Sequence, residues 1–182
     1  MTEQMVVTLG ADGEPSSVMP RMAAHIAPGV LHLAVSLQVV DPSGGWLLQQ
    51  RAATKLTFAG RWANTCCTHP APGEEPAAAA VRRARQEVGL VVSRVVPAGC
   101  FVYRAEDPSS GIVEWELDHV FAVVADTSAA TVDPAEIDDV ARLPYADALR
   151  LVTSPAGAPW AAEVLERSFA ALRAVGAVGP RS

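Results

Sequence analysis

The stretch GEEPAAAAVRRARQEVGL (residues 73–90) predicts an α-helix over residues 77–88. Acids and a proline precede its first turn, alanine fills much of its interior, and Gly89 stands just past its end, all ordinary signals of a helix. Its apolar residues recur at helical spacing, with Arg83 and Glu87 four positions apart beside that stripe. Both charged side chains can therefore point at one ligand.

Patterns typical of β-strands precede and follow this helix. Before it, they predict one hairpin around an Asp-Gly turn and a second around a turn rich in Pro, Ser and Gly. After it, they predict two long pairing strands, a last strand and two more helices. The predicted strands cover residues 6–9, 16–19, 31–40, 46–50, 91–103, 112–124 and 137–142, and the helices cover 145–152 and 159–174. We therefore expect an α/β protein of the α+β type, with mixed β-sheets flanked by helices.

The length of 182 residues fits one domain with a continuous core. No window approaches the roughly 20 unbroken apolar residues of a membrane-spanning helix, so we expect a soluble protein without membrane contacts. Residues 1–5 are acidic and lack a signal-type apolar run, which favours a cytoplasmic location. A net charge of −6 and an isoelectric point near 5.1 argue against a nucleic-acid partner. We also expect a monomer.

The chain has three cysteines, an odd number with two of them adjacent, which does not fit a disulfide framework. Taken alone, Cys67 is more often a small buried hydrophobe than a reactive thiol, although a neighbouring cation would lower its pKa. We interpret Cys66, which should face the opposite side, and Cys100, in an apolar strand, as structural.

Residues 51–72 show no periodicity and are dense in Arg, Lys, Trp, Asn, Cys and His, which indicates a long functional loop around a buried strand. Lys55 is the only lysine of the chain. Two explanations are open for this single lysine. It is a chance survival in a sequence biased towards arginine, or its position needs a compact ammonium group to bind phosphate.

Two pairs of polar residues are spaced to share one face of a strand, Cys67 with His69 and Glu114 with Glu116. Taken alone, the two glutamates fit a solvated strand face better, and isolated histidines are ordinary in surface loops. Together, three imidazoles and two carboxylates form a set suited to Mn²⁺, Mg²⁺ or Zn²⁺. This set is His25, His32, His69, Glu114 and Glu116.

The string GRWANTCCTHP (residues 60–70) resembles the signature of type I isopentenyl diphosphate isomerases, G-x-W-T-N-x-x-C-x-H-P. AAH (23–25) and LHLA (31–34) support the resemblance upstream, as do YRA (103–105) and GIVEWE (111–116) downstream. Judged by the order of these motifs, it covers roughly residues 5–165.

The resemblance implies a Nudix-like fold in one isomerase domain over residues 1–182, with a core at about 5–165 and a C-terminal helix at about 159–175. Positions of the Nudix box are held by Glu74, Arg82, Glu87, Gly89 and Leu90. Arg83 and Gln86 stand where nucleotide-hydrolysing relatives carry metal-binding glutamates. These replacements weaken a hydrolase's metal cluster and favour diphosphate capture.

The resemblance also assigns roles to individual residues. A first metal ion is expected at the His/Glu set named above, and a Mg²⁺ near Glu87 that bridges to the diphosphate. The expected diphosphate ligands are Arg21, Arg51, Lys55 and Arg83. The expected acid-base groups are Cys67 and Glu116, helped by Tyr103. Trp62 and Trp160, which alone would read as core residues, are expected to cap an apolar pocket, where the Trp160 indole stabilises a cation.

The implied reaction interconverts isopentenyl and dimethylallyl diphosphate, through protonation of the alkene, a carbocation and deprotonation on the other face. Phe58-Ala59 and the long turn at residues 107–111 depart from the family pattern, so a larger isoprenoid remains an alternative substrate. Two different functions also stay open, those of a Nudix diphosphohydrolase and of a non-catalytic prenyl-diphosphate-binding module. The sequence leaves undecided the metal at the histidines and the first proton donor of the pair Cys67 and Glu116.

Overall fold

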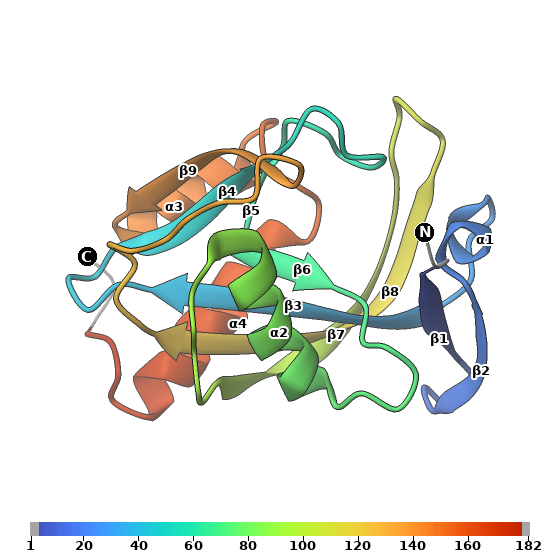
Figure 1. Cartoon of the computed structure of the whole chain (residues 1–182), viewed down its shortest axis with the longest axis horizontal. Helices are drawn as coiled ribbons and strands as arrows, with labels where there is room; N and C mark the ends of the chain where they lie inside the picture. The colour runs from blue at the N-terminus through green and yellow to red at the C-terminus, as the bar shows by residue number, and fades with distance from the viewer. Residues whose placement is uncertain (1–3, 180–182) are drawn as a thin grey trace.

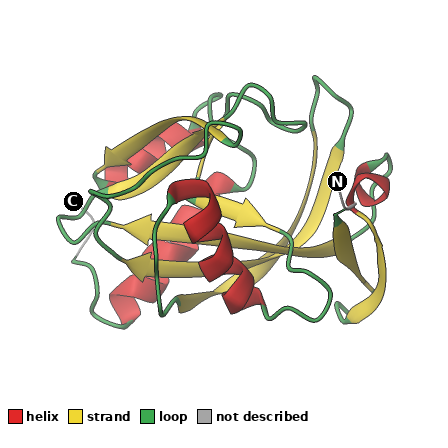
Figure 2. Ribbon diagram, in the orientation of Figure 1, coloured by secondary structure: helices red, strands yellow, loops and turns green. Residues whose placement is uncertain are grey.

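The computed structural model describes residues 4–179, in which nine strands form one mixed sheet with helices on both faces (Figures 1 and 2). The strands are β1 (Met5–Leu9), β2 (Pro15–Pro20), β3 (His32–Val40), β4 (Trp46–Arg51), β5 (Trp62–Ala63), β6 (Cys66–Thr68), β7 (Val96–Glu106), β8 (Val113–Val124) and β9 (Ile137–Leu143). The helices are α1 (Arg21–His25), α2 (Pro76–Val88), α3 (Tyr145–Thr153) and α4 (Ala161–Ala174). The α+β class with mixed sheets and flanking helices is confirmed.

Strand β3 is the hub of the sheet. It pairs in parallel with β8 along its whole length, and it pairs antiparallel with β6 on its other side. Its end pairs antiparallel with β4, which itself pairs with β5 and β9. Both predicted hairpins are present, and β7 pairs antiparallel with β8 as expected.

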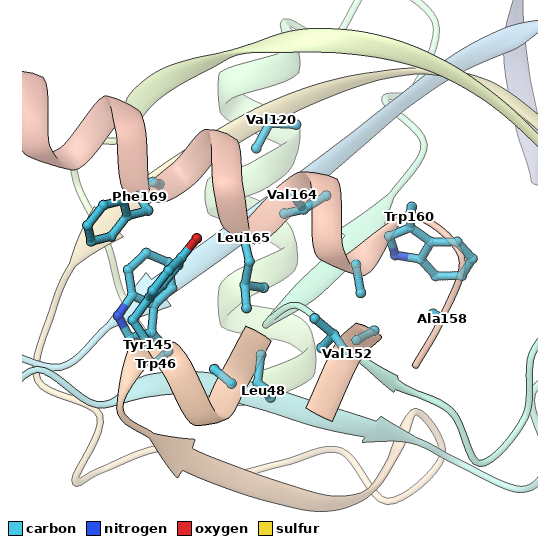
Figure 3. Close-up of a cluster of buried hydrophobic side chains, with 14 of the residues drawn as sticks. Trp46, Leu48, Val120, Tyr145, Val152, Ala158, Trp160, Val164, Leu165 and Phe169 are labelled. Carbon is cyan, nitrogen blue, oxygen red and sulfur yellow. The ribbon is translucent and has the colours of Figure 1, made fainter. Parts of the chain in front are cut away.

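Side chains alternate along β3, so this strand contributes residues to two hydrophobic clusters, one on each face of the sheet. On one face, Val35, Leu37 and Val39 pack under α2 with Ala80 and Ala84. On the other face, Trp46, Tyr145, Phe169 and Leu165 join the sheet to α3 and α4 (Figure 3). Burial of each such large side chain contributes about 1.5–3 kcal/mol.

Local sequence explains where the helices begin and end. Pro76 occupies the first turn of α2, and Gly89 ends that helix in the left-handed conformation at φ 66°, with its N–H donating to the carbonyl of Ala84. The predicted helix at 159–174 is α4, which begins at Ala161, so Pro159 lies in the preceding turn. Among residues 4–179, none of the helices combines the length and apolarity that a membrane crossing requires.

Three local predictions are wrong. The strand predicted from Val91 begins only at Val96, because residues 91–95 run beside α2, where Val92 is buried and Val91 is 82% exposed. Cys100 is exposed rather than structural, because an irregularity in β7 between Pro97 and Cys100 shifts the register with β8. The loop at residues 51–72 contains two short strands, β5 and β6, rather than one. Helix α1 was not predicted, because its five residues are too few to show a helical repeat of apolar side chains.

The turn before α4 depends on Gly157. A Cβ added there would lie 1.8 Å from the carbonyl oxygen of Val152, and the neighbours of Gly157 exchange backbone hydrogen bonds with Trp62 of β5. We predict that Gly157→Ala lowers the free energy of unfolding by about 1–3 kcal/mol, because the backbone must shift to relieve the overlap. Urea denaturation measures this free energy of unfolding. Gly179→Ala, in open space, is the control and should match the unchanged protein; equal stability of both variants would contradict the prediction.

Candidate functional site

A small cavity of about 110 Å³ opens beside the first halves of β3 and β8, and it gathers most of the predicted site residues. Those that line it are Arg21, His25, Arg51, Lys55, Cys67, His69, Arg83, Tyr103, Glu114, Glu116 and Trp160. His32, Glu87 and Trp62 are not among the lining residues. A larger groove, about 1060 Å³, runs between α2 and residues 91–95, but none of the predicted site residues lines it.

Four side chains from separate elements converge at one end of this cavity. Their ligand atoms, on His25, His32, His69 and Glu116, all lie within 4.8 Å of one another. The Nε2 of His69 is 3.1 Å from the Nε2 of His32 and 2.9 Å from Oε1 of Glu116. We call this group the His/Glu cluster. So close an approach of three ring nitrogens and a carboxylate is the arrangement that a bound cation needs.

Hydrogen bonds outside the cluster orient two of its imidazoles. The Nδ1 of His25 lies 2.7 Å from the carbonyl of Arg21, and the Nδ1 of His32 lies 2.7 Å from the carbonyl of Val30. Because a carbonyl can only accept, each Nδ1 carries a proton, which leaves Nε2 as the atom that faces the cluster and can bind a metal ion when the ring is neutral. Burial and the two neighbouring histidines lower the pKa of His25 to about 4, so that this ring is neutral, the form that binds metal. The donor set therefore fits a divalent ion.

The interpretation of Glu114 and Glu116 as a solvated strand face is wrong, since they are only 8% and 5% exposed. Periodicity shows that the two share a face of β8 but not what covers that face. Glu114 stands apart from the cluster, with Oε2 4.0 Å from Nε2 of His25, and its Oε1 accepts a hydrogen bond from Thr57 at 2.6 Å. Burial and the charge of Glu116 raise the pKa of Glu114 to about 8.

The four expected diphosphate ligands all line the cavity. Arg51 donates to the carbonyl of Thr57, and its guanidinium lies 5.3 Å from the ring centre of Trp160. Arg83 of α2 forms ion pairs with Glu87 and, at 3.0 Å, with Glu136. Glu136 also accepts a hydrogen bond from Lys55. One carboxylate therefore neutralises two of the four cations.

The Cys67 thiol is held between two polar side chains. Its Sγ lies 3.3 Å from Oγ of Ser36 and 3.3 Å from Oδ1 of Asn64. Burial and the charge of Asp118 raise the pKa of Cys67 to about 12. The residue therefore keeps its proton as a thiol, which suits a proton-transfer group better than a covalent nucleophile.

The second acid-base candidate pairs with a phenol. The hydroxyl of Tyr103 donates to Oε2 of Glu116 at 2.6 Å, and burial together with that carboxylate raises the pKa of Tyr103. Trp160 packs against Tyr103 with ring centres 5.7 Å apart, and its Nε1 donates to Asn64 at 3.1 Å. Trp62 instead belongs to β5 and packs against the hydrophobic cluster under α4, so it does not cap the cavity.

Sequence reasoning missed four polar residues that contact the site. Ser36 interrupts an apolar run on β3, and Asn64 belongs to the quoted motif, so both carried a weak signal. Asp118 continues the alternation of Glu114 and Glu116, a pattern that a solvated strand face also produces, yet its side chain is only 1% exposed. Glu136 carried no signal, because its partners are far away in the sequence.

Comparison with known proteins agrees with this geometry. A family model described as the NUDIX domain matches residues 30–167. An isopentenyl-diphosphate Delta-isomerase of Streptomyces griseus is 41% identical over 172 residues, which cover 93% of this chain and 85% of the relative. The chain belongs to the isopentenyl-diphosphate Delta-isomerase family. Another member, from Nocardia farcinica, is 45% identical over 163 residues, which cover 88% of this chain and 92% of the relative.

Solved structures show the same Nudix fold at low identity. The Deinococcus radiodurans protein DR0079 has a TM-score of 0.72 and 17% identity, with 91% of this chain and 99% of that chain covered. A MutT protein of Methanosarcina mazei has a TM-score of 0.61 and 18% identity, with 77% and 94% covered. The Nudix match begins at residue 30, so His25 and Arg21 come from the preceding segment, which α1 places beside the common fold.

We predict that the His/Glu cluster binds about one divalent ion per chain. After treatment with a chelator, adding Mn²⁺ or Zn²⁺ should raise the melting temperature, because an ion at 100 times its Kd stabilises a folded state by about 2.7 kcal/mol. Thermal unfolding and elemental analysis measure both effects. His69→Gln should abolish them, whereas His119→Gln, whose ring lies outside the cluster, should retain them. Equal ion content in the two variants would place the ion elsewhere.

Proposed function

We propose that this protein interconverts isopentenyl and dimethylallyl diphosphate. The observation that carries the proposal is the placement of two proton-bearing groups around one cavity, Cys67 on β6 and the pair Tyr103 and Glu116 on β7 and β8. Strand β3 separates β6 from β8, so the two groups reach the cavity from different sides of that strand. The names and identities of the curated relatives support the same reaction.

In the proposed mechanism, some residues that line the cavity bind the substrate and others transfer protons. Arg21, Arg51, Lys55 and Arg83 bind the diphosphate and so hold the five-carbon chain at the proton-bearing groups. One group protonates the alkene, and the other removes a proton from the resulting tertiary carbocation; in the reverse direction they exchange roles. His25, His32, His69 and Glu116 would hold a divalent ion, for which we propose Mn²⁺, Mg²⁺ or Zn²⁺, and its charge would polarise the Glu116 side into a stronger acid.

The cavity itself favours the small substrate and protects the cation. Its volume of about 110 Å³ lies well below the 300–1,000 Å³ of pockets for drug-sized ligands, so it suits a five-carbon chain better than a longer isoprenoid. The buried Trp160 excludes water, and its indole face stabilises a cationic intermediate.

Hydrolysis is the weaker candidate, because α2 directs a cation at the site. Arg83 lies between Glu87 and Glu136 and pairs with both. A positive charge there disfavours a cluster of several metal ions and attracts a diphosphate. Glu87 is buried, with Oε2 accepting a hydrogen bond from Gln49 at 3.2 Å, and we propose that it approaches the Mg²⁺ carried by the substrate.

The reaction can be followed by NMR in heavy water with isopentenyl diphosphate and Mg²⁺. We predict dimethylallyl diphosphate with deuterium in its carbon chain, and a fall in kcat of about 100-fold or more for Cys67→Ala, because the proton-transfer group is lost. Cys100→Ala changes an exposed cysteine away from the cavity and should keep full activity.

Three results would contradict the proposal. Absence of both the product and deuterium uptake would exclude isomerisation. Release of phosphate with an unchanged double bond would indicate a hydrolase. Equal rates for Cys67→Ala and Cys100→Ala would remove Cys67 from the mechanism.

Glu136 should compete with the diphosphate for Lys55 and Arg83. We predict that Glu136→Gln lowers the Kd of inorganic pyrophosphate about two- to fivefold, the range that partly exposed ion pairs produce, when titrated by calorimetry in Mg²⁺. Glu163→Gln, which removes an ion pair with Arg167 on α4, is the control and should not change the Kd. Weaker binding by Glu136→Gln would show that Glu136 helps to hold the ligand.

A further inference from the structure

Asp118 is a buried carboxylate to which the proposed function gives no task. It lies on β8, two residues after Glu116 and on the same face. Its Oδ2 accepts a hydrogen bond from Ser36 at 2.7 Å, while its buried Oδ1 has no hydrogen-bond partner among residues 4–179. Burial of a polar group with so few partners costs stability. A buried carboxylate with an unpaired oxygen is rare enough to suggest a functional role.

Asp118 is connected to Cys67 through Ser36, across three neighbouring strands. Ser36 of β3 stands directly opposite Cys67 of β6 in the antiparallel register. On the other side, β3 pairs with β8, and the Ser36 hydroxyl reaches Asp118. Its Oγ lies 2.7 Å from Oδ2 of Asp118 and 3.3 Å from Sγ of Cys67. We call these three side chains the Cys67–Ser36–Asp118 row.

The chemistry of the three groups determines the direction of their protons. Serine has one O–H, and here it donates to Oδ2 of Asp118. Ser36 therefore presents only lone pairs to Cys67, and the thiol must be the donor. The thiol also donates to Oδ1 of Asn64 at 3.3 Å, and this amide oxygen has two lone pairs and accepts from Trp160 as well, so the single S–H faces two acceptors.

We propose that Asp118 is a positioning residue for Cys67: it accepts the hydrogen bond of the Ser36 hydroxyl, so that Ser36 faces the sulfur only as an acceptor and the S–H stays directed between Ser36 and Asn64. Without that carboxylate, the hydroxyl of Ser36 is free to donate to the sulfur instead, which reverses the hydrogen bond. The consequence for isomerisation rests on the proposed function: the proton of Cys67 has a defined direction before the substrate arrives, and chemistry requires such alignment.

The hydrogen bond can be tested without any activity. The S–H stretching band of Cys67 is identified by infrared difference spectra between the unchanged protein and Cys67→Ala. Ser36→Ala and Asp118→Ala should each shift this band to higher wavenumber as the bond to Ser36 is lost. Asp118→Asn should restore its position, because the amide oxygen can accept the same hydroxyl proton. Ser168→Ala, the same deletion at another buried serine, should leave the band unchanged. An unmoved band in Ser36→Ala and Asp118→Ala, or no restoration by Asp118→Asn, would overturn the proposal.

Kinetics test the consequence. Asp118→Ala should lower kcat about 10- to 100-fold and change KM less than about twofold, because the row contacts none of the cations that hold the diphosphate. Ser36→Ala should behave alike, and the double variant should be no slower than the slower single one, as expected for residues that act as one unit. Losses that multiply, or a loss in KM alone, would contradict a positioning role.

The two proposals fail in different ways. If the protein without any substitution lacks isomerase activity, the proposed function is refuted. The infrared band of Cys67 then still tests the hydrogen bonds of the Cys67–Ser36–Asp118 row. An active protein that Cys67→Ala inactivates but Asp118→Ala leaves unchanged refutes the positioning role alone. If Ser36→Ala does not fold, the pair Asp118→Ala and Asp118→Asn still decides, because these variants differ only in the acceptor that they offer Ser36.

Discussion

The parallel pairing of β3 with β8 determines which side chains meet in the cavity. Its register places His32 beside Glu116 and brings Ser36 within reach of Asp118. Because side chains alternate along a strand, a slip of β3 by one residue would turn His32 and Ser36 to the opposite face. The apolar residues of β3 that pack under α2 would then leave their core, at a cost of about 1.5–3 kcal/mol for each large side chain. The hydrophobic core thus maintains the register that the polar site requires.

The same face of β8 is polar in its first half and apolar in its second. Glu114, Glu116 and Asp118 give way to Val120 and Ala122, which join the cluster under α4. Three buried carboxylates in a row repel one another, and the structure offsets this with a different partner for each: a hydroxyl for Glu114, imidazoles and a phenol for Glu116, and Ser36 for Asp118. A cation at the His/Glu cluster adds to this balance at the carboxylate that has most contacts. Glu116 is therefore both the carboxylate with the most hydrogen-bond partners and the one that belongs to the His/Glu cluster.

Periodicity and turn signals were sufficient to predict the strands, α2 and the alternation that sets His69 beside Cys67, because these depend on local geometry. Burial was not predictable in this way, since the pattern of Glu114, Glu116 and Asp118 is the same on an open or a covered face. Irregular backbone was also missed: the shift in β7 that exposes Cys100 leaves no periodic trace. The family motif supplied the assembly of distant residues, but Glu136 belongs to no motif and emerged only from its contacts with Lys55 and Arg83.

The fold alone does not choose the chemistry, since proteins at 17–18% identity share this Nudix architecture. What distinguishes this chain is where charge has been placed on the common sheet. A cation, Arg83, projects from α2 toward the cavity, and the segment before residue 30 adds His25 and Arg21 through α1. The family resemblance implies that Arg83 stands where nucleotide-hydrolysing relatives carry a metal-binding glutamate, and His25 completes the His/Glu cluster that could hold a cation. In the proposed binding mode, Arg51, Lys55 and Arg83 hold the diphosphate while Cys67 and Tyr103 face the five-carbon chain, so the double bond rather than the phosphoanhydride meets the acid-base groups.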